Sequence, residues 1–90
     1  MIGEFKTFHV YCYDRNDPRL CERTYVVTAP DDIYATNYAS LVANHYPAAR
    51  PVPYIMRVSA PMKRTLHGGA LVHGWYEGSA YHSVNYVPQP

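Results

Sequence analysis

The chain has 90 residues, a net charge of +1 at pH 7, and 48 % hydrophobic and 17 % charged residues. This composition excludes intrinsic disorder, and the length predicts one domain with a small core over residues 1–87, followed by a frayed tail at 88–90. No segment approaches the roughly 18 consecutive apolar residues of a membrane span, and residues 1–8 lack the apolar run of a secretion signal. We therefore expect a cytoplasmic protein with no membrane partner.

Two strands are predicted first. Residues 5–13, FKTFHVYCY, are rich in aromatic and β-branched residues, and residues 21–29 alternate well enough for a second strand that ends near Thr28. The turn cluster NDP at 16–18 lies between them, so we expect a hairpin. Alternation places Phe8, Val10 and Cys12 on one face of the first strand.

The two cysteines flank this turn. A symmetric hairpin places Cys12 opposite Cys21, which permits a disulfide, although thiols in a reducing compartment are more often core residues. The same register sets Arg23 opposite Val10 on the core face. We therefore expect a bulge or a shifted register in this hairpin.

A helix is predicted next, up to Pro47. Thr28 is the expected N-cap, with Asp31 three residues later in a capping-box arrangement. Apolar residues then recur at spacings of three and four, which predicts a stripe that packs on a sheet. The stripe consists of Ala35, Tyr38, Ala39, Val42 and Tyr46.

The rest of the chain predicts three further strands. Residues 53–60 form the third, 70–76 the fourth and 80–87 a weaker fifth, with a basic connection at 62–69. We expect an α+β domain, β-β-α-β-β, with one helix across one face of a small antiparallel sheet in the spatial order 2-1-3-4. On the third strand Tyr54, Met56 and Val58 would share one face and Ile55, Arg57 and Ser59 the other, and on the fourth Leu71, His73 and Trp75 would share a face.

The sequence contains little that indicates a catalytic site or a metal site. His67, His73 and His82 match no compact zinc-ligand spacing, and no nucleophile motif or phosphate-binding loop is present. We predict no catalytic residue, no cofactor and no metal. A small metal-binding or enzymatic domain stays open as an alternative.

The charges are distributed unevenly. No acidic residue occurs between Ile33 and Tyr76, whereas Arg50, Arg57, Lys63 and Arg64 all do. This predicts a basic ridge along the third strand and the connection after it, suited to an acidic protein surface or to nucleic acid. Base stacking on the outer face of the first strand, with Phe5, His9 and Tyr11, keeps a nucleic-acid-binding module open as an alternative.

A resemblance covers residues 5–61. KTFHVY as an aromatic opening strand, YVVTAPDDIYATNYASLVANHYP as strand and helix, and YIMRVSAP as third strand resemble the small podophage-encoded inhibitors of bacterial RNA polymerase. A similar pattern occurs in some small anti-CRISPR proteins. The resemblance implies a three-stranded sheet with one helix that docks on the polymerase jaw and blocks promoter opening. It also implies paired arginines on the third strand: Arg57 matches the first, but Ser59 replaces the second, and the chain from Met62 onward has no counterpart.

Together these observations predict a small non-enzymatic protein, phage-encoded, that acts in the host cytoplasm. It would bind and inhibit a host protein complex, either RNA polymerase or a defence complex such as a CRISPR effector. The expected basic contact is Arg57, Lys63 and Arg64, with Tyr11 and Trp75 as aromatic anchors. Uncovered sheet edges also predict a homodimer if copies associate.

Overall fold

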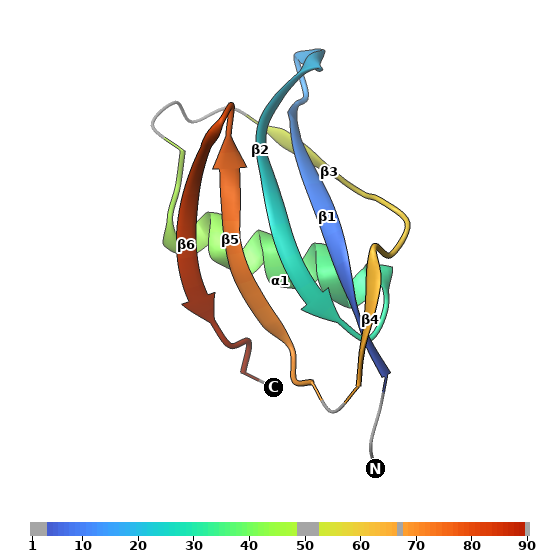
Figure 1. Ribbon diagram of the computed structural model, residues 1–90. Coiled ribbons are helices and arrows are strands. Elements are labelled where there is room, and N and C mark those ends of the chain that lie inside the picture. The colour runs from blue at the N-terminus through green and yellow to red at the C-terminus, as the bar shows by residue number, and fades with distance from the viewer. Residues whose placement is uncertain (1–3, 49–52, 67, 90) are drawn as a thin grey trace.

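The computed structural model describes residues 4–48, 53–66 and 68–89, which form six strands and one helix (Figure 1). All strand pairs are antiparallel, and the helix crosses one face of the sheet. The predicted α+β class is therefore confirmed. The elements are β1 (Glu4–Asp14), β2 (Asp17–Ala29), α1 (Asp32–His45), β3 (Tyr54–Val58), β4 (Lys63–Leu66), β5 (Leu71–Glu77) and β6 (Ala80–Tyr86).

The sheet order is β3-β1-β2-β5-β6, and β4 also pairs with β1. The short strands β3 and β4 share one edge of β1, since β3 pairs with residues 10–14 and β4 with residues 4–7. The predicted neighbourhood of the first three strands is correct. The predicted position of the fourth strand is wrong, because β5 pairs with β2 instead of β3.

The connection predicted at 62–69 explains this difference. It contains β4, which runs along β1 until Leu66 lies opposite Glu4. This end of β1 is also next to the end of β2, where Lys6 opposes Ala29. The chain therefore crosses to the uncovered edge of β2, and β5 begins there with Leu71 opposite Thr28 (Figure 1).

A bulge interrupts the hairpin of β1 and β2. Cys12 lies opposite Arg23 and Tyr13 opposite Cys21, with a register shift between these two pairs. The irregularity that the sequence predicted is thus present, and it separates the cysteines in register. Both are free thiols, so no disulfide forms.

The helix begins later than predicted. Asp31 is the N-cap, and its Oδ1 accepts a hydrogen bond from the backbone N of Tyr34 at 2.9 Å. Thr28 cannot cap the helix because β2 continues through Ala29 and Thr28 pairs with β5. The predicted apolar stripe is confirmed from Ala35 to Val42, since Ala35, Ala39 and Val42 are buried, but Tyr46 is 47 % exposed.

The core lies between α1 and the sheet. The predicted faces of β1 and β3 are correct, since Phe8, Val10 and Cys12 are buried and the side chains of Tyr54, Met56 and Val58 pack against the same cluster. The buried hydrophobic residues are Phe8, Val10, Cys12, Tyr25, Val27, Ala29, Ala35, Ala39, Val42, Val72 and Trp75.

The face predicted for the fourth strand is wrong because β5 is bulged. Register shifts occur on both sides of β5 near Gly74, whose φ is 156°. A Cβ on Gly74 would lie 2.2 Å from the carbonyl oxygen of His82, so only glycine fits there. The bulge sends Trp75 into the core, whereas His73 bonds Thr28 on the opposite side of the sheet.

The chain ends beside this sheet. Pro88 is buried, Gln89 is exposed, and position 90 lies outside the described residues. Among the described residues, no helix is long and apolar enough to cross a membrane.

Candidate binding face of the sheet

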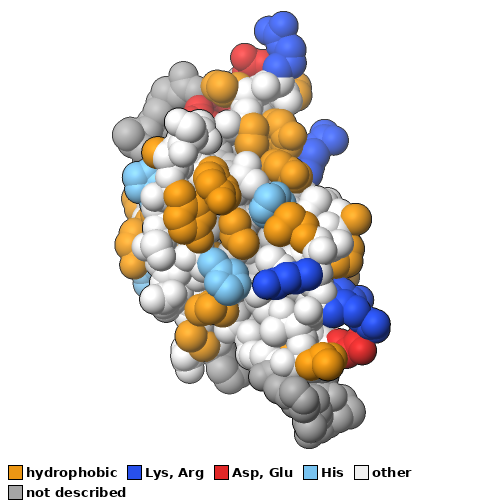
Figure 2. Space-filling view, in the orientation of Figure 1, with side chains coloured by type: hydrophobic (Ala, Val, Ile, Leu, Met, Phe, Trp, Pro, Cys, Tyr) orange, Lys and Arg blue, Asp and Glu red, His pale blue; other side chains and the backbone are white. Residues whose placement is uncertain are grey.

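The sheet has a face that α1 does not cover, and we call it the open face. Strand alternation and the two bulges place on it an aromatic and polar set of side chains. Figure 2 shows hydrophobic side chains and two histidines in the middle of this side, with one lysine or arginine beside the lower histidine and others at the upper end and toward the right. The open face consists of Thr7, His9, Tyr11, Tyr13, Val26, Thr28, Ile55, Arg57, Lys63, Thr65, Leu71, His73, Tyr76 and Tyr81.

A groove of about 640 Å³ lies on the open face. Its walls come from β1, β2, β4, β5, β6 and the segments around β4, so it exists only because β4 and β5 lie on opposite sides of the β1–β2 hairpin. Lys63, His9 and His73 are its basic side chains. The other lining residues are Thr7, Val26, Thr28, Met62, Thr65, Gly68, Gly69, Leu71, Tyr76 and Tyr81.

A chain of hydrogen bonds crosses the groove from β1 to β5. The Oγ1 atoms of Thr7 and Thr28 are 3.2 Å apart, and Thr28 Oγ1 is 2.8 Å from Nε2 of His73. Burial lowers the pKa of His73, and the charge of Lys63 lowers it further. The lowered pKa favours the neutral form of His73 at neutral pH, and Nε2 is engaged with Thr28.

No acidic side chain of the described residues lines this groove. Glu4 pairs with Arg64 at 2.6 Å, and Glu77 pairs with Arg23 at 2.7 Å. In Figure 2 acidic side chains show only toward the ends of the molecule. The groove therefore favours a ligand or surface with negative charge.

Aromatic rings extend from the groove along β1. His9 and Tyr11 have ring centroids 6.1 Å apart in an edge-to-face arrangement, and Tyr11 and Tyr13 are 6.3 Å apart. Arg57 lies opposite Tyr11 in the register of β1 and β3, and its guanidinium is 6.0 Å from the centroid of Tyr13. A cation thus ends a row of aromatic rings, which is a common composition at protein interfaces.

The five residues that were predicted to contact a partner do not all lie on the same surface. Tyr11, Arg57 and Lys63 lie on the open face. Arg64 alternates with Lys63 on β4 and pairs with Glu4 at the edge. Trp75 is only 6 % exposed and lies in the core. Arg50, which belonged to the predicted basic ridge, lies outside the described residues.

Other residues of the open face were not among the predicted contact residues. Tyr13 has the same strand parity as Tyr11 and was therefore detectable. Tyr76 and Tyr81 pair across the turn between β5 and β6, with ring centroids 4.7 Å apart. Their place in the groove follows from the bulge at Gly74, which simple alternation does not reveal.

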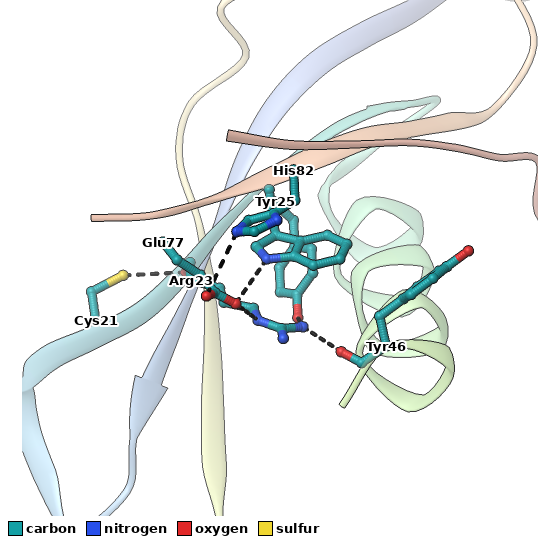
Figure 3. Close-up of polar contacts among 7 residues, drawn as sticks. Cys21, Arg23, Tyr25, Tyr46, Glu77 and His82 are labelled. Carbon is teal, nitrogen blue, oxygen red and sulfur yellow. Dashed lines mark hydrogen bonds and ion pairs between the residues drawn. The ribbon is translucent and has the colours of Figure 1, made fainter. Parts of the chain in front are cut away.

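The covered side holds a separate polar cluster (Figure 3). Arg23 is buried and donates to Oε1 of Glu77, to the hydroxyl of Tyr25 at 3.2 Å and to the backbone oxygen of Tyr46. Its guanidinium also lies 4.4 Å from the ring centroid of Trp75. These contacts join β2, β5 and the end of α1. The cluster therefore stabilises the packing of the helix on the sheet.

The cluster shifts the pKa values of its members. Burial lowers the pKa of Arg23, but its bonds to Tyr25 and Glu77 outweigh this and raise the pKa above its ordinary value. Burial raises the pKa of Glu77, but hydrogen bonds from Trp75 and Arg23 outweigh this and lower it. Both groups therefore remain charged at neutral pH.

The histidines among the described residues do not gather around a metal. His73 faces the groove, whereas His82 stacks on Trp75 on the other side of the sheet, with centroids 5.2 Å apart. His67 lies outside the described residues. Within residues 4–48, 53–66 and 68–89, no group of three or more His, Cys, Asp or Glu side chains is placed to hold a metal ion.

The fold and the open face define a small α+β domain whose exposed sheet surface is basic and aromatic. Comparison of the chain with family models, with curated proteins and with solved structures found no match. The function is therefore argued from the open face itself.

Proposed function

We propose that this protein is a non-enzymatic binding protein that docks its open face on an acidic surface of a host macromolecular machine and inhibits that machine. The observation that supports this most is the row of aromatic rings next to Arg57 and Lys63, without an acidic side chain in the adjoining groove. The resemblance to phage-encoded polymerase inhibitors suggests bacterial RNA polymerase or a CRISPR effector as the machine, and a phage as the source.

Arg57 is the main anchor of this proposal. Its side chain is exposed on β3, and the Tyr13 ring beside it reduces the conformational freedom that binding would remove. A guanidinium bonds a carboxylate through two parallel hydrogen bonds, and arginines flanked by tyrosines are frequent hot spots of interfaces. Tyr11, directly opposite Arg57, supplies the apolar contact next to it.

Lys63 extends the contact along the sheet. It lies on β4, opposite Thr7, where β4 continues the edge that β3 begins. Arg57 and Lys63 are thus held along the same edge of β1 by backbone pairing. A partner with acidic groups along one ridge would meet both cations at once.

The test is direct binding to purified bacterial RNA polymerase and to purified CRISPR effector complexes, measured at fixed salt, together with inhibition of the bound machine. We expect Arg57→Ala to weaken binding about 30-fold or more, as hot-spot arginines do, with unchanged thermal stability. Arg64→Ala is the matched control, because Arg64 pairs with Glu4 instead of facing the groove, and it should bind like the wild type. Binding of neither machine, or equal binding by Arg57→Ala, would contradict the proposal.

Single-stranded nucleic acid is the second candidate, and the ring row of His9, Tyr11 and Tyr13 favours it. Its affinity would fall steeply with added salt, because cations released from phosphates drive such binding. Tyr11→Ala should then weaken oligonucleotide binding while Tyr34→Ala, on the exposed part of α1, leaves it unchanged. Flat salt dependence would exclude this candidate.

A further inference from the structure

The groove of the open face has the size of a small-molecule site. Its volume of about 640 Å³ falls within the roughly 300–1,000 Å³ of typical ligand pockets. Protein docking through Arg57 and Tyr11 requires no such hollow, because those residues lie farther along the sheet and do not line it. The groove is therefore large enough to bind a ligand separately from the contact at Arg57.

One part of the groove suits a phosphate. Lys63, His9 and His73 supply cationic or N–H donors, and none of the acidic residues among those described is present to repel an anion. A phosphate oxygen accepts such hydrogen bonds strongly, because charge-assisted bonds are about twice as strong as neutral ones.

The threonine chain allows His73 to change its charge without losing a hydrogen bond. When His73 is neutral, Thr7 donates to Thr28 and Thr28 donates to Nε2. When His73 is protonated, Nε2–H donates to Thr28 and Thr28 donates to Thr7. The distances of 3.2 Å and 2.8 Å serve both directions, since only hydroxyl hydrogens rotate.

Another part of the groove suits an aromatic base. Tyr76 and Tyr81 are 41 % and 44 % exposed, and both line the groove with their rings 4.7 Å apart. Val26, which lies between the partners of Tyr76 and Leu71 on β2, adds an apolar wall. A flat base can stack on an exposed tyrosine ring, and such contacts are sequence-tolerant.

We propose that this groove binds a nucleoside monophosphate, with the phosphate at Lys63, His9 and His73 and the base against Tyr76 and Tyr81. The phosphate neutralises the repulsion between Lys63 and a protonated His73, so binding takes up a proton from solvent on His73. The groups that face His73 in the groove are Lys63 from β4, His9 from β1, and the uncharged Thr28, Tyr76 and Tyr81.

This proton uptake makes binding depend on pH. Affinity should rise as pH falls from about 8 to about 6, because the bound state holds one more proton than the free protein. The second ionisation of phosphate, with a pKa near 6, acts in the opposite direction. His73→Gln, which keeps a partner for Thr28 but cannot titrate, supplies the baseline, and His9→Gln separates the contribution of His9.

The experiment is calorimetric titration of the full chain with adenosine monophosphate, inorganic phosphate and adenosine. We expect the nucleotide to bind at least about tenfold more tightly than either fragment, because it uses both parts of the groove. Lys63→Ala should lower nucleotide affinity about tenfold, as should Tyr76→Ala. Their matched controls are Arg64→Ala and Tyr34→Ala, which lie outside the groove and should change nothing.

The proton on His73 has its own readout in the imidazole signals of the protein by nuclear magnetic resonance. Saturating nucleotide should raise the pKa of His73 and leave the imidazole signals of His82, on the other face, unchanged. The proposal is overturned if the nucleotide does not bind at millimolar concentration, if phosphate or adenosine alone binds equally well, or if His73→Gln retains the full pH dependence.

A last titration distinguishes a free nucleotide from one nucleotide of a single strand as the natural ligand. A short single-stranded oligonucleotide that binds more tightly than the monophosphate, with the same loss in Lys63→Ala and Tyr76→Ala, would show that the groove holds one nucleotide of a strand. Equal or weaker binding would show that free nucleotide is the ligand. Lys63 serves both proposals, so Arg57→Ala, whose site does not line the groove, separates them: this variant should bind the nucleotide like the wild type.

Discussion

Arg23 of β2 and Glu77 of β5 are 54 positions apart in the sequence, and Nε of Arg23 donates to Oε1 of Glu77 at 2.7 Å. The same Oε1 accepts the indole N–H of Trp75 at 2.9 Å. One carboxylate thus fixes both the arginine and the tryptophan of the core side. The pair links β2 to β5, two strands that the sequence did not predict to be neighbours.

Replacing Arg23 should destabilise the fold. Its side chain is only 7 % exposed, and Arg23→Ala leaves the Tyr25 hydroxyl and the Tyr46 carbonyl without this donor. We expect a loss of about 2–3 kcal/mol in the free energy of unfolding, measured by denaturant titration. Arg19→Ala is the control, because Arg19 is exposed on the hairpin, and it should match the wild type. Identical curves for both variants would show that the contacts of Arg23 have no structural role.

The stability of the fold should depend on pH through Glu77. Its folded pKa is lowered below the ordinary value of 4.5, so its contribution is fully present above that value and is lost as pH falls through the folded pKa. Glu77→Gln should therefore be less stable than the wild type at pH 7, with the difference shrinking below about pH 4. Thermal unfolding of both proteins between these pH values measures it. Parallel curves across the range would contradict the prediction.

Gly74 should resist substitution. Gly74→Ala places a Cβ 2.2 Å from the carbonyl oxygen of His82 and 2.8 Å from the hydroxyl of Tyr81, and it imposes a strained φ. We expect a loss of at least about 2 kcal/mol in unfolding free energy. Gly69→Ala serves as the control, since nothing lies within 4 Å of its added Cβ. A Gly74→Ala protein as stable as the control would mean that the bulge is not required.

The two thiols should differ in reactivity. Burial raises the pKa of Cys12 to about 11, so this thiol is protonated as well as inaccessible at neutral pH. Cys21 is partly exposed. We expect iodoacetamide to modify one thiol of the folded protein and both thiols after unfolding, as counted by mass spectrometry. Rapid modification of a Cys21→Ser variant would contradict this assignment.

The strands and the helix whose hydrophobic residues recur at a regular spacing were predictable. Alternation placed Phe8, Val10 and Cys12 on the core face of β1, and the stripe of Ala35, Ala39 and Val42 identified the buried side of α1. These patterns are local because a strand repeats every two residues and a helix about every 3.6. The helix start was missed because β2 continues past Thr28, which hydrogen bonds across the sheet instead of capping.

The candidate site was only partly predictable. Tyr11 and Arg57 were identified and share the open face, because their strand parity is a property of their own segments. Lys63 was identified by its charge alone, and its place on this face follows from β4, which was predicted as a connection. Trp75 was misplaced, since the bulge at Gly74 reverses parity within β5. The local sequence pattern does not show this bulge, because the close approach to Gly74 comes from the carbonyl oxygen of His82 on the neighbouring strand.

The sequence by itself determined the α+β class, the hairpin, the helix and the acid-free stretch that makes one surface basic. Tertiary structure alone decided that β5 joins β2, that Arg23 is buried against Glu77, and that His9, His73 and Lys63 line one groove. The physical reason is that strand edges offer the same backbone donors and acceptors whatever their side chains. The choice among free edges therefore depends on where the preceding strand ends and on how the whole core packs.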